Sequence, residues 1–226
     1  MSDFLCIGHR GARGLEPENT LRSIRKALVL GADGVEIDVY AVKNQLVVIH
    51  DETLERTTNG SGRVEAQSFE YLRSLDAGKG EKIPTLREVL DTVDRRAFVN
   101  IELKGRQTAG LASGLIGEYV AAHAWKDADF LVSSFDLDEL GKLKNSGIRL
   151  GTLFTEPPEN YAGIAKYLGA YSVHIAVESA NEDFITDAHR HGLKVFVYTV
   201  NSIDGIRRMR DIGADGVFTD YPDRMA

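Results

Sequence analysis

The sequence has little of several features that mark special classes of protein. Its 226 residues include one cysteine, Cys6, so an internal disulfide cannot form, and its place in an apolar run favours a buried packing role. No apolar run approaches the roughly 18 residues of a membrane helix. The N-terminal run 4–7 is short and has no basic lead, unlike a signal peptide. We therefore expect a cytoplasmic protein with no integral membrane segment.

Excess positive charge and zinc-binding patterns are also missing. The chain has 27 Lys and Arg residues against 34 Asp and Glu residues, a formal charge of -7. This balance predicts no nucleic-acid partner, and an anionic substrate would need local cations or a bound metal ion. No Cys/His cluster has zinc spacing. With 43% hydrophobic and 27% charged residues, the composition is that of an ordinary globular protein, and the length predicts one domain over residues 1–226.

Short apolar runs alternate with amphipathic segments from end to end. The apolar runs predict strands near 4–8, 34–39, 46–50, 97–102, 130–134, 149–154, 171–176, 194–200 and 216–219. The amphipathic segments predict helices near 19–30, 85–94, 108–124, 136–146, 158–168, 181–191 and 202–212, with a smaller one near 68–75. The runs 34–39 and 46–50 lie too close for a crossover helix, so we interpret them as one barrel strand with a hairpin or bulged extension. Eight barrel strands remain, which predicts an α/β fold, a (β/α)8 TIM barrel.

One short repeat and one irregular segment complete the organisation. Gly-Ala-Asp-Gly-Val occurs at 31–35 and again at 213–217, and we interpret both copies as equivalent helix-to-strand corners. An open doubly wound sheet has similar corners, so the repeat alone does not select the barrel. Residues at about 51–80 are polar, rich in glycine near 56–62 and without periodicity. We expect a small insertion after the second strand that caps the site, the alternative being an inert surface loop.

Three acidic residues follow the alternation of two predicted strands. Glu36 and Asp38 share one face of the strand at 34–39, and Glu102 lies on the corresponding strand at 97–102. On the inside of a barrel these carboxylates would repel one another unless a cation or proton intervened. Their oxygens suit a hard cation such as Mg2+ or Ca2+. The alternative is carboxylates that face solvent or pair with basic neighbours.

Cations and imidazoles lie at the ends of the same predicted strands. His9 and Arg10 stand between two glycines, and His50 ends another apolar run. The Arg10 guanidinium suits a phosphate, and two imidazoles supply one proton acceptor and one donor. Lys104 is a candidate phosphate contact, or else a simple partner of Glu102.

The remaining polar candidates carry less weight. Asn19 resembles the N-cap of a helix, next to the presumed rim of the site. His189 and His191 lie in a helix's last turn, where positive charge suits the helix dipole. His123 is expected at the surface, and His174, on a predicted strand, is a weak candidate to line the interior.

The ordered motifs resemble those of the glycerophosphodiester phosphodiesterase family across nearly the whole chain. The matching segments are Gly8-His9-Arg10-Gly11, Pro17-Glu18-Asn19-Thr20, Glu36-Ile37-Asp38-Val39, His50-Asp51, Glu102-Leu103-Lys104, Tyr198-Thr199-Val200-Asn201 and Thr219-Asp220-Tyr221-Pro222. The resemblance implies a barrel with a short insertion and one divalent cation, Mg2+ or Ca2+ with Mn2+ as a further candidate. It implies metal ligands at Glu36, Asp38 and Glu102, an acid/base pair at His9 and His50, and phosphate contacts at Arg10 and Lys104.

One position departs from the family pattern. Tyr198 stands where the family often has Trp, so the resemblance implies that the aromatic wall of the substrate pocket persists while its width changes. The expected reaction is hydrolysis of a glycerophosphodiester to sn-glycerol 3-phosphate and an alcohol. Alternatives are a lysophospholipase D-type diesterase on the same site, a Schiff-base aldolase-like enzyme that uses Lys104, and a non-catalytic phosphate-binding protein. A homo-oligomer is a further candidate state.

Overall fold

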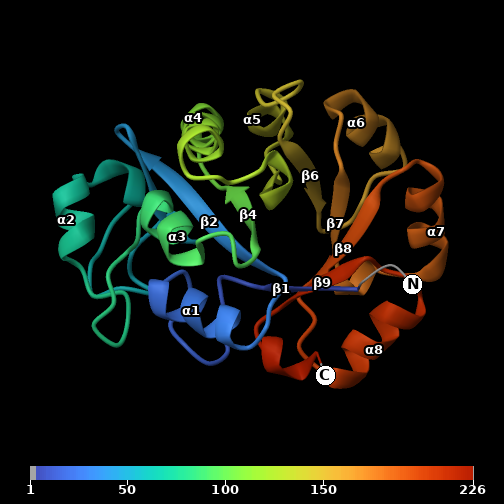
Figure 1. Ribbon diagram of the computed structural model, residues 1–226, viewed down its shortest axis with the longest axis horizontal. Coiled ribbons are helices and arrows are strands. Elements are labelled where there is room, and N and C mark those ends of the chain that lie inside the picture. Colours follow the sequence, from blue (N-terminus) through green and yellow to red (C-terminus); the bar gives the residue numbers. More distant parts are fainter. Residues whose placement is uncertain (1–3, 226) are drawn as a thin grey trace.

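The computed structural model describes residues 4–225, which form a closed barrel of parallel strands surrounded by helices (Figure 1). Strand β1 pairs with β2 on one side and with β9 on the other, which closes the ring. The barrel strands are β1 (Leu5–Gly8), β2 (Gly34–Val42), β4 (Phe98–Leu103), β5 (Phe130–Ser134), β6 (Arg149–Phe154), β7 (Ser172–Ala176), β8 (Lys194–Tyr198) and β9 (Gly216–Thr219). The predicted (β/α)8 barrel is confirmed.

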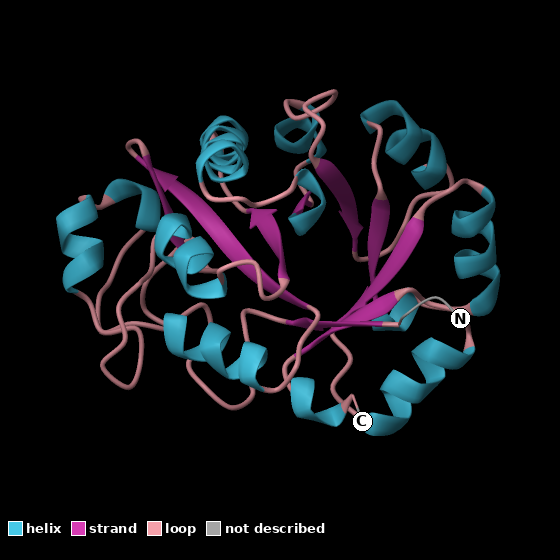
Figure 2. Cartoon of the chain, in the orientation of Figure 1, coloured by secondary structure: helices cyan, strands magenta, loops and turns pink. Residues whose placement is uncertain are grey.

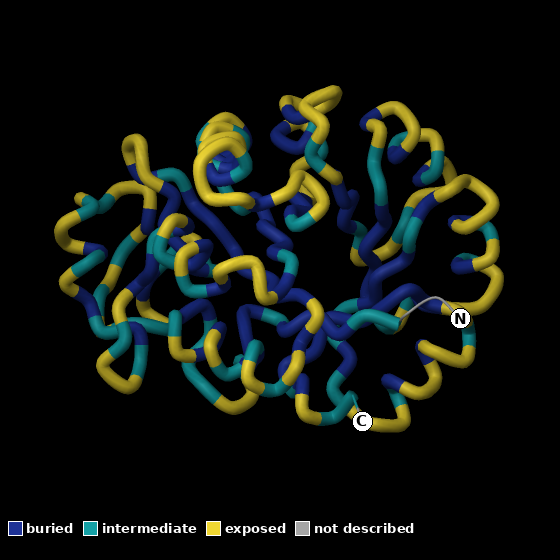
Figure 3. The backbone as a smooth tube through the Cα atoms, in the orientation of Figure 1, coloured by how far each residue is buried: buried dark blue, intermediate teal, exposed yellow. Residues whose placement is uncertain are grey.

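Helices form the outer layer of the barrel, apart from α2 (Phe69–Ser74), which lies in the segment between β3 (Gln45–Val48) and α3 (Leu86–Val93) (Figure 2). The helices are α1 (Leu21–Val29), α2, α3, α4 (Thr108–Ala122), α5 (Leu137–Gly141), α6 (Tyr161–Leu168), α7 (Glu182–Arg190) and α8 (Ile203–Asp211), with short 3-10 turns η1 (Val64–Ala66), η2 (Asp127–Asp129), η3 (Val177–Ser179) and η4 (Pro222–Arg224). Apolar side chains that alternate with the site residues along β2, such as Val35 and Ile37, are fully buried. Burial accordingly follows the strands, and exposure the outer surface of the helices (Figure 3).

The two copies of the five-residue repeat occupy matching corners. Gly31 ends α1 with φ +81 and Gly213 ends α8 with φ +89, a backbone conformation that glycine adopts without steric cost. Asp33 accepts the backbone N–H of Cys6 at 2.8 Å, and Asp215 accepts that of Val195 at 2.8 Å. Each aspartate therefore fastens the start of one strand to the strand beside it, which confirms the structural interpretation of the repeat.

Strand β2 continues beyond the barrel as a hairpin. Its last residues pair antiparallel with β3 (Gln45–Val48), as the close spacing of the two apolar runs predicted. The chain between β3 and α3 then carries η1 and α2 and packs on a small core of its own that includes Leu54, Val64 and Leu72. This segment lies beside the barrel in Figure 1.

The entry to α1 corrects one prediction. Asn19 is not the N-cap: its backbone has φ +57, and the helix is capped by Thr20, whose hydroxyl accepts the N–H of Ser23 at 3.2 Å. The Asn19 amide instead donates to Asp38 at 2.9 Å and accepts the Asp38 N–H at 3.3 Å. The loop before α1 therefore supports a residue on β2, and a helix-start signal concealed this contact.

Candidate active site

A cavity of about 200 Å³ opens at the carboxyl ends of the barrel strands. Its floor is apolar, since Ile7, Phe196 and Phe218 pack together inside the barrel. It is lined by His9, Arg10, Glu36, His50, Asn100, Glu102, Lys104, Phe135, Leu153, His174, Tyr198, Thr199 and Phe218. No residue of 51–80 in the described part of the chain belongs to this lining, so the predicted cap stays a prediction. The insertion borders the site through Asp51, which contacts His50, and through Arg56, which contacts Asp51.

Three buried carboxylates meet at one point of the cavity wall. One oxygen each of Glu36, Asp38 and Glu102 lies within 4.8 Å of the others. Asp38 on β2 is the direct neighbour of Glu102 on β4, and the two-residue period places Glu36 on the same inner face. The alternative of solvent-facing carboxylates is therefore wrong, whereas its second form, pairing with basic neighbours, is present, since Lys104 lies 2.8 Å from Glu102.

The cluster is electrostatically unfavourable without a cation. Burial, together with repulsion from Asp38 and Glu102, raises the pKa of Glu36 well above its ordinary value. Burial and the Asp38 charge likewise raise the pKa of Glu102 to about 7. The buried Glu36 Oε1 has no hydrogen-bond partner among the described residues. Three oxygen donors that repel one another, one of them unsatisfied, fit a hard divalent cation.

Arg10 and Lys104 hold positive charge against this cluster. Arg10 donates its backbone N–H to Glu36 at 2.8 Å, and its Nε lies 3.4 Å from Asp38. Lys104 Nζ lies 2.8 Å from Glu102 and 3.6 Å from Asp38. Burial lowers the pKa of Lys104, but the neighbouring carboxylates outweigh it and the pKa is raised. Both side chains therefore present charge to the cavity while they pair with carboxylates.

The two imidazoles have similar carboxylate partners. His9 Nδ1 lies 2.7 Å from Asp220, which also accepts from Asn201 at 2.8 Å, and Arg13 Nε lies 3.2 Å from the same aspartate. Burial lowers the pKa of His9 despite the hydrogen bond to Asp220. The Nδ1 contact leaves Nε2 as the nitrogen available to a substrate.

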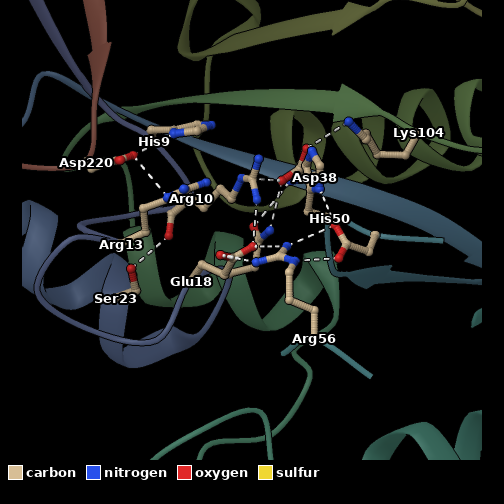
Figure 4. Close-up of polar contacts among 12 residues, drawn as sticks. His9, Arg10, Arg13, Glu18, Ser23, Asp38, His50, Arg56, Lys104 and Asp220 are labelled. Carbon is tan, nitrogen blue, oxygen red and sulfur yellow. Dashed lines mark hydrogen bonds and ion pairs between the residues drawn. The ribbon is translucent and has the colours of Figure 1, made fainter. Parts of the chain in front are cut away.

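His50 is held by the residue that follows it. Its Nδ1 lies 2.6 Å from Asp51, whose carboxylate accepts from Arg56 at 2.5 Å (Figure 4). Burial is the main cause of the lowered pKa of His50. Both imidazoles therefore line the cavity with Nδ1 occupied by a carboxylate.

The rest of the cavity wall is largely apolar and aromatic. Phe135, which is 46% exposed, meets Tyr198 edge-on with ring centroids 6.1 Å apart. The Tyr198 hydroxyl donates to the backbone carbonyl of Phe154 at 3.0 Å. His174 is fully buried beneath them, and burial lowers its pKa to about 3. It is therefore neutral and belongs to the packing of the floor.

Known proteins match this chain in sequence and in structure. The profile of the glycerophosphoryl diester phosphodiesterase family covers residues 9–224. The chain belongs to this family. A glycerophosphodiester phosphodiesterase from Caldanaerobacter subterraneus subsp. tengcongensis is 35% identical over 98% of this chain and 96% of its own, and a lysophospholipase D from Homo sapiens is 26% identical over 97% and 84%. A phosphodiesterase structure from Oleispira antarctica, in complex with the product sn-glycerol-3-phosphate, is 30% identical over 98% and 94%, with a TM-score of 0.91.

Membership of the glycerophosphoryl diester phosphodiesterase family confirms the predicted resemblance and the enzyme class, a phosphoric diester hydrolase. The family profile spans both the strands that carry the carboxylates and the last strand, β9. Within residues 4–225, no helix is long and apolar enough to cross a membrane.

The structure brings together the side chains that the sequence singled out. The predicted residues that line the cavity are His9, Arg10, Glu36, His50, Glu102, Lys104, Tyr198 and the weaker candidate His174, and Asp38 joins them through the carboxylate cluster. The sequence reasoning did not assign the carboxylates that hold the imidazoles. Asp51 and Asp220 stand inside quoted family motifs, so that signal was present. Arg56 lies in a loop without periodicity and gave none.

Proposed function

We propose that this member of the family hydrolyses a glycerophosphodiester to sn-glycerol 3-phosphate and a free alcohol, with a divalent cation held by Glu36, Asp38 and Glu102. The supporting observation is the cluster of three buried carboxylates whose oxygens lie within 4.8 Å of one another, at a cavity that two imidazoles also line. Such a cation would supply Lewis-acid stabilisation of charge on the phosphoryl oxygens.

The phosphate would meet two fixed positive charges in the cavity. Arg10 is buried and offers a planar set of donors, and Lys104 is a point charge on the neighbouring wall. Because carboxylates already hold both side chains in place, little reorganisation is needed when negative charge grows on the phosphoryl group. This environment opposes the aldolase alternative, since a Schiff-base lysine needs a lowered pKa and that of Lys104 is raised.

The two imidazoles would share the proton transfers. One takes the proton of the attacking oxygen through Nε2 as the new P–O bond forms, and the other protonates the alcohol oxygen as the old P–O bond breaks. The attacking oxygen is that of water or of the adjacent glycerol hydroxyl. Asp220 and Asp51 each accept from Nδ1, which fixes the tautomer and favours the protonated form that the reaction creates.

A substrate and metal screen tests this function. The purified protein is incubated with glycerophosphocholine, glycerophosphoethanolamine, glycerophosphoglycerol and a lysophospholipid, each with Mg2+, Ca2+, Mn2+ or EDTA. We expect release of sn-glycerol 3-phosphate with at least one cation and loss of turnover with EDTA. Turnover of the lysophospholipid alone would favour the lysophospholipase D alternative, and full turnover in EDTA would contradict the role of the cluster.

A further inference from the structure

Arg56, from the insertion, contacts two acidic side chains at once. Its Nε and Nη2 donate to the two carboxylate oxygens of Asp51 at 2.5 and 2.9 Å. Its Nη1 and Nη2 donate to the two oxygens of Glu18 at 2.9 and 2.8 Å. All three guanidinium nitrogens are therefore used, and Figure 4 shows the Arg56 side chain beside Glu18.

Each acidic partner of Arg56 contacts a different group of the proposed reaction. Asp51 lies 2.6 Å from His50 Nδ1, and Glu18 accepts from Arg10 Nη1 at 2.6 Å. The contacts form one continuous chain of five side chains, with the imidazole at one end and the buried guanidinium at the other. Arg56 is the middle member.

We propose that Arg56 is a positioning residue that keeps His50 and Arg10 in one relative geometry, through Asp51 and Glu18 respectively. The inference rests on the proposed function, because it concerns the groups that would transfer a proton and hold the phosphate. A loop residue outside the cavity lining then sets the alignment of two residues inside it.

The chemistry of arginine explains this choice of residue. Its planar fork pairs with two carboxylates in fixed directions, whereas a lysine ammonium has no such directionality. The hydrogen bond from Arg56 is the main cause of the lowered pKa of Asp51. Burial opposes ionisation of Glu18, but Arg56 and Arg10 outweigh it and lower its pKa to about 2. Both carboxylates therefore remain charged acceptors at neutral pH.

His9 offers an internal contrast to this arrangement. Its aspartate, Asp220, accepts from Asn201 and lies against Arg13. These contacts brace one imidazole, whereas the Arg56 chain connects an imidazole to the phosphate-binding guanidinium. A simple surface brace is the competing explanation for Arg56, since its side chain is 48% exposed and isolated surface pairs contribute little.

Steady-state kinetics on a glycerophosphodiester at saturating cation separate the two explanations. We expect Arg56→Ala to lower kcat/KM by about 10–100-fold, as loss of supporting partners does in comparable sites, with kcat reduced and KM raised. Arg56→Lys should recover part of the loss. The matched control is Arg63→Ala, which removes an exposed pair with Glu52 at 3.1 Å in the same insertion and should leave kcat and KM unchanged. Melting temperatures of all variants are measured alongside.

The two arms of the chain give separate readouts. We expect Asp51→Asn to act mainly on kcat, through His50, and Glu18→Gln to act mainly on KM, through Arg10. Combined with Arg56→Ala, each should cost less than the product of the two single effects, because the residues act as one unit.

Three results would overturn the inference in distinguishable ways. If Arg56→Ala lowers only the melting temperature and matches Arg63→Ala in kcat and KM, Arg56 is a surface brace. If the wild-type protein turns over none of the diesters with any cation, the proposed function fails. This inference then fails as well, because it rests on that function. Multiplicative effects in the double variants would likewise contradict a connected chain.

Discussion

The two sides of the cavity differ in what they are made of. Strands β1, β2 and β4 supply the charged groups, from His9 and Arg10 to Glu102, whereas β5 to β8 contribute an apolar and aromatic wall with Phe135 and Tyr198. On the charged side, buried carboxylates repel one another and carry raised pKa values. None of the described residues that line the aromatic side is a carboxylate. This barrel therefore concentrates its candidate catalytic groups on adjacent strands, and the repulsion among buried carboxylates is found on the same strands.

The largest effects should come from the imidazoles on the charged side. We expect His9→Ala and His50→Ala each to lower kcat by about 100–10,000-fold on an alkyl diester, the usual range for a general acid or base. On a diester with a p-nitrophenol leaving group, one of the two variants should recover, because p-nitrophenolate leaves without a proton. The recovering variant identifies the acid. Equal losses of both variants on both substrates would contradict a division into acid and base.

Neutralising one metal-binding carboxylate should separate activity from stability. We expect Glu36→Gln to lower kcat/KM by at least about 100-fold and to weaken cation binding in calorimetry. The same change removes a buried charge that Asp38 and Glu102 repel, so the metal-free protein should melt higher, by about 2–4 °C per kcal/mol of repulsion removed.

Glu139→Gln is the matched control for that result. Glu139 is also a buried carboxylate, but it accepts the N–H of Ala109 at 2.9 Å and pairs with Lys142 at 2.5 Å, outside the cavity lining. Its replacement should lower the melting temperature and leave kcat/KM unchanged. A lower melting temperature for Glu36→Gln as well would show that the charged side is not strained.

The aromatic side should respond more weakly. We expect Phe135→Ala to raise KM by up to about tenfold, which corresponds to about 1.4 kcal/mol, with kcat retained. Tyr198→Phe, which removes only the hydroxyl bonded to the Phe154 carbonyl, should change kcat/KM by about twofold or less. We compare KM and kcat of each variant between a diester with a small alcohol head group and one with a bulky head group. A large fall in kcat for either variant would show that the aromatic side also takes part in the chemical step.

The same division explains what could be predicted from the sequence. The two-residue period of a strand placed Glu36, Asp38 and Glu102 on one inner face, and alternation of strands and helices gave the barrel. Loops have no such period. Asn19 matched a helix-cap signal, yet its positive φ turns the amide toward Asp38. Arg56 and Glu18 meet only through folding, because they lie 38 positions apart in the chain.

The charged side should also make stability depend on pH. The pKa of Glu18 is lowered from 4.5 to about 2, so the unfolded chain binds a proton there before the folded one does. The stability that Glu18 contributes is present above pH 4.5 and is lost as the pH falls toward 2. We expect this contribution to be about 1 kcal/mol or less, because solvent screens the half-exposed Arg56. The free energies of unfolding of wild type and Glu18→Gln, measured in urea, should differ most above pH 4.5 and converge toward pH 2. A difference that does not change with pH would show that the charge of the Glu18 carboxylate does not stabilise the fold.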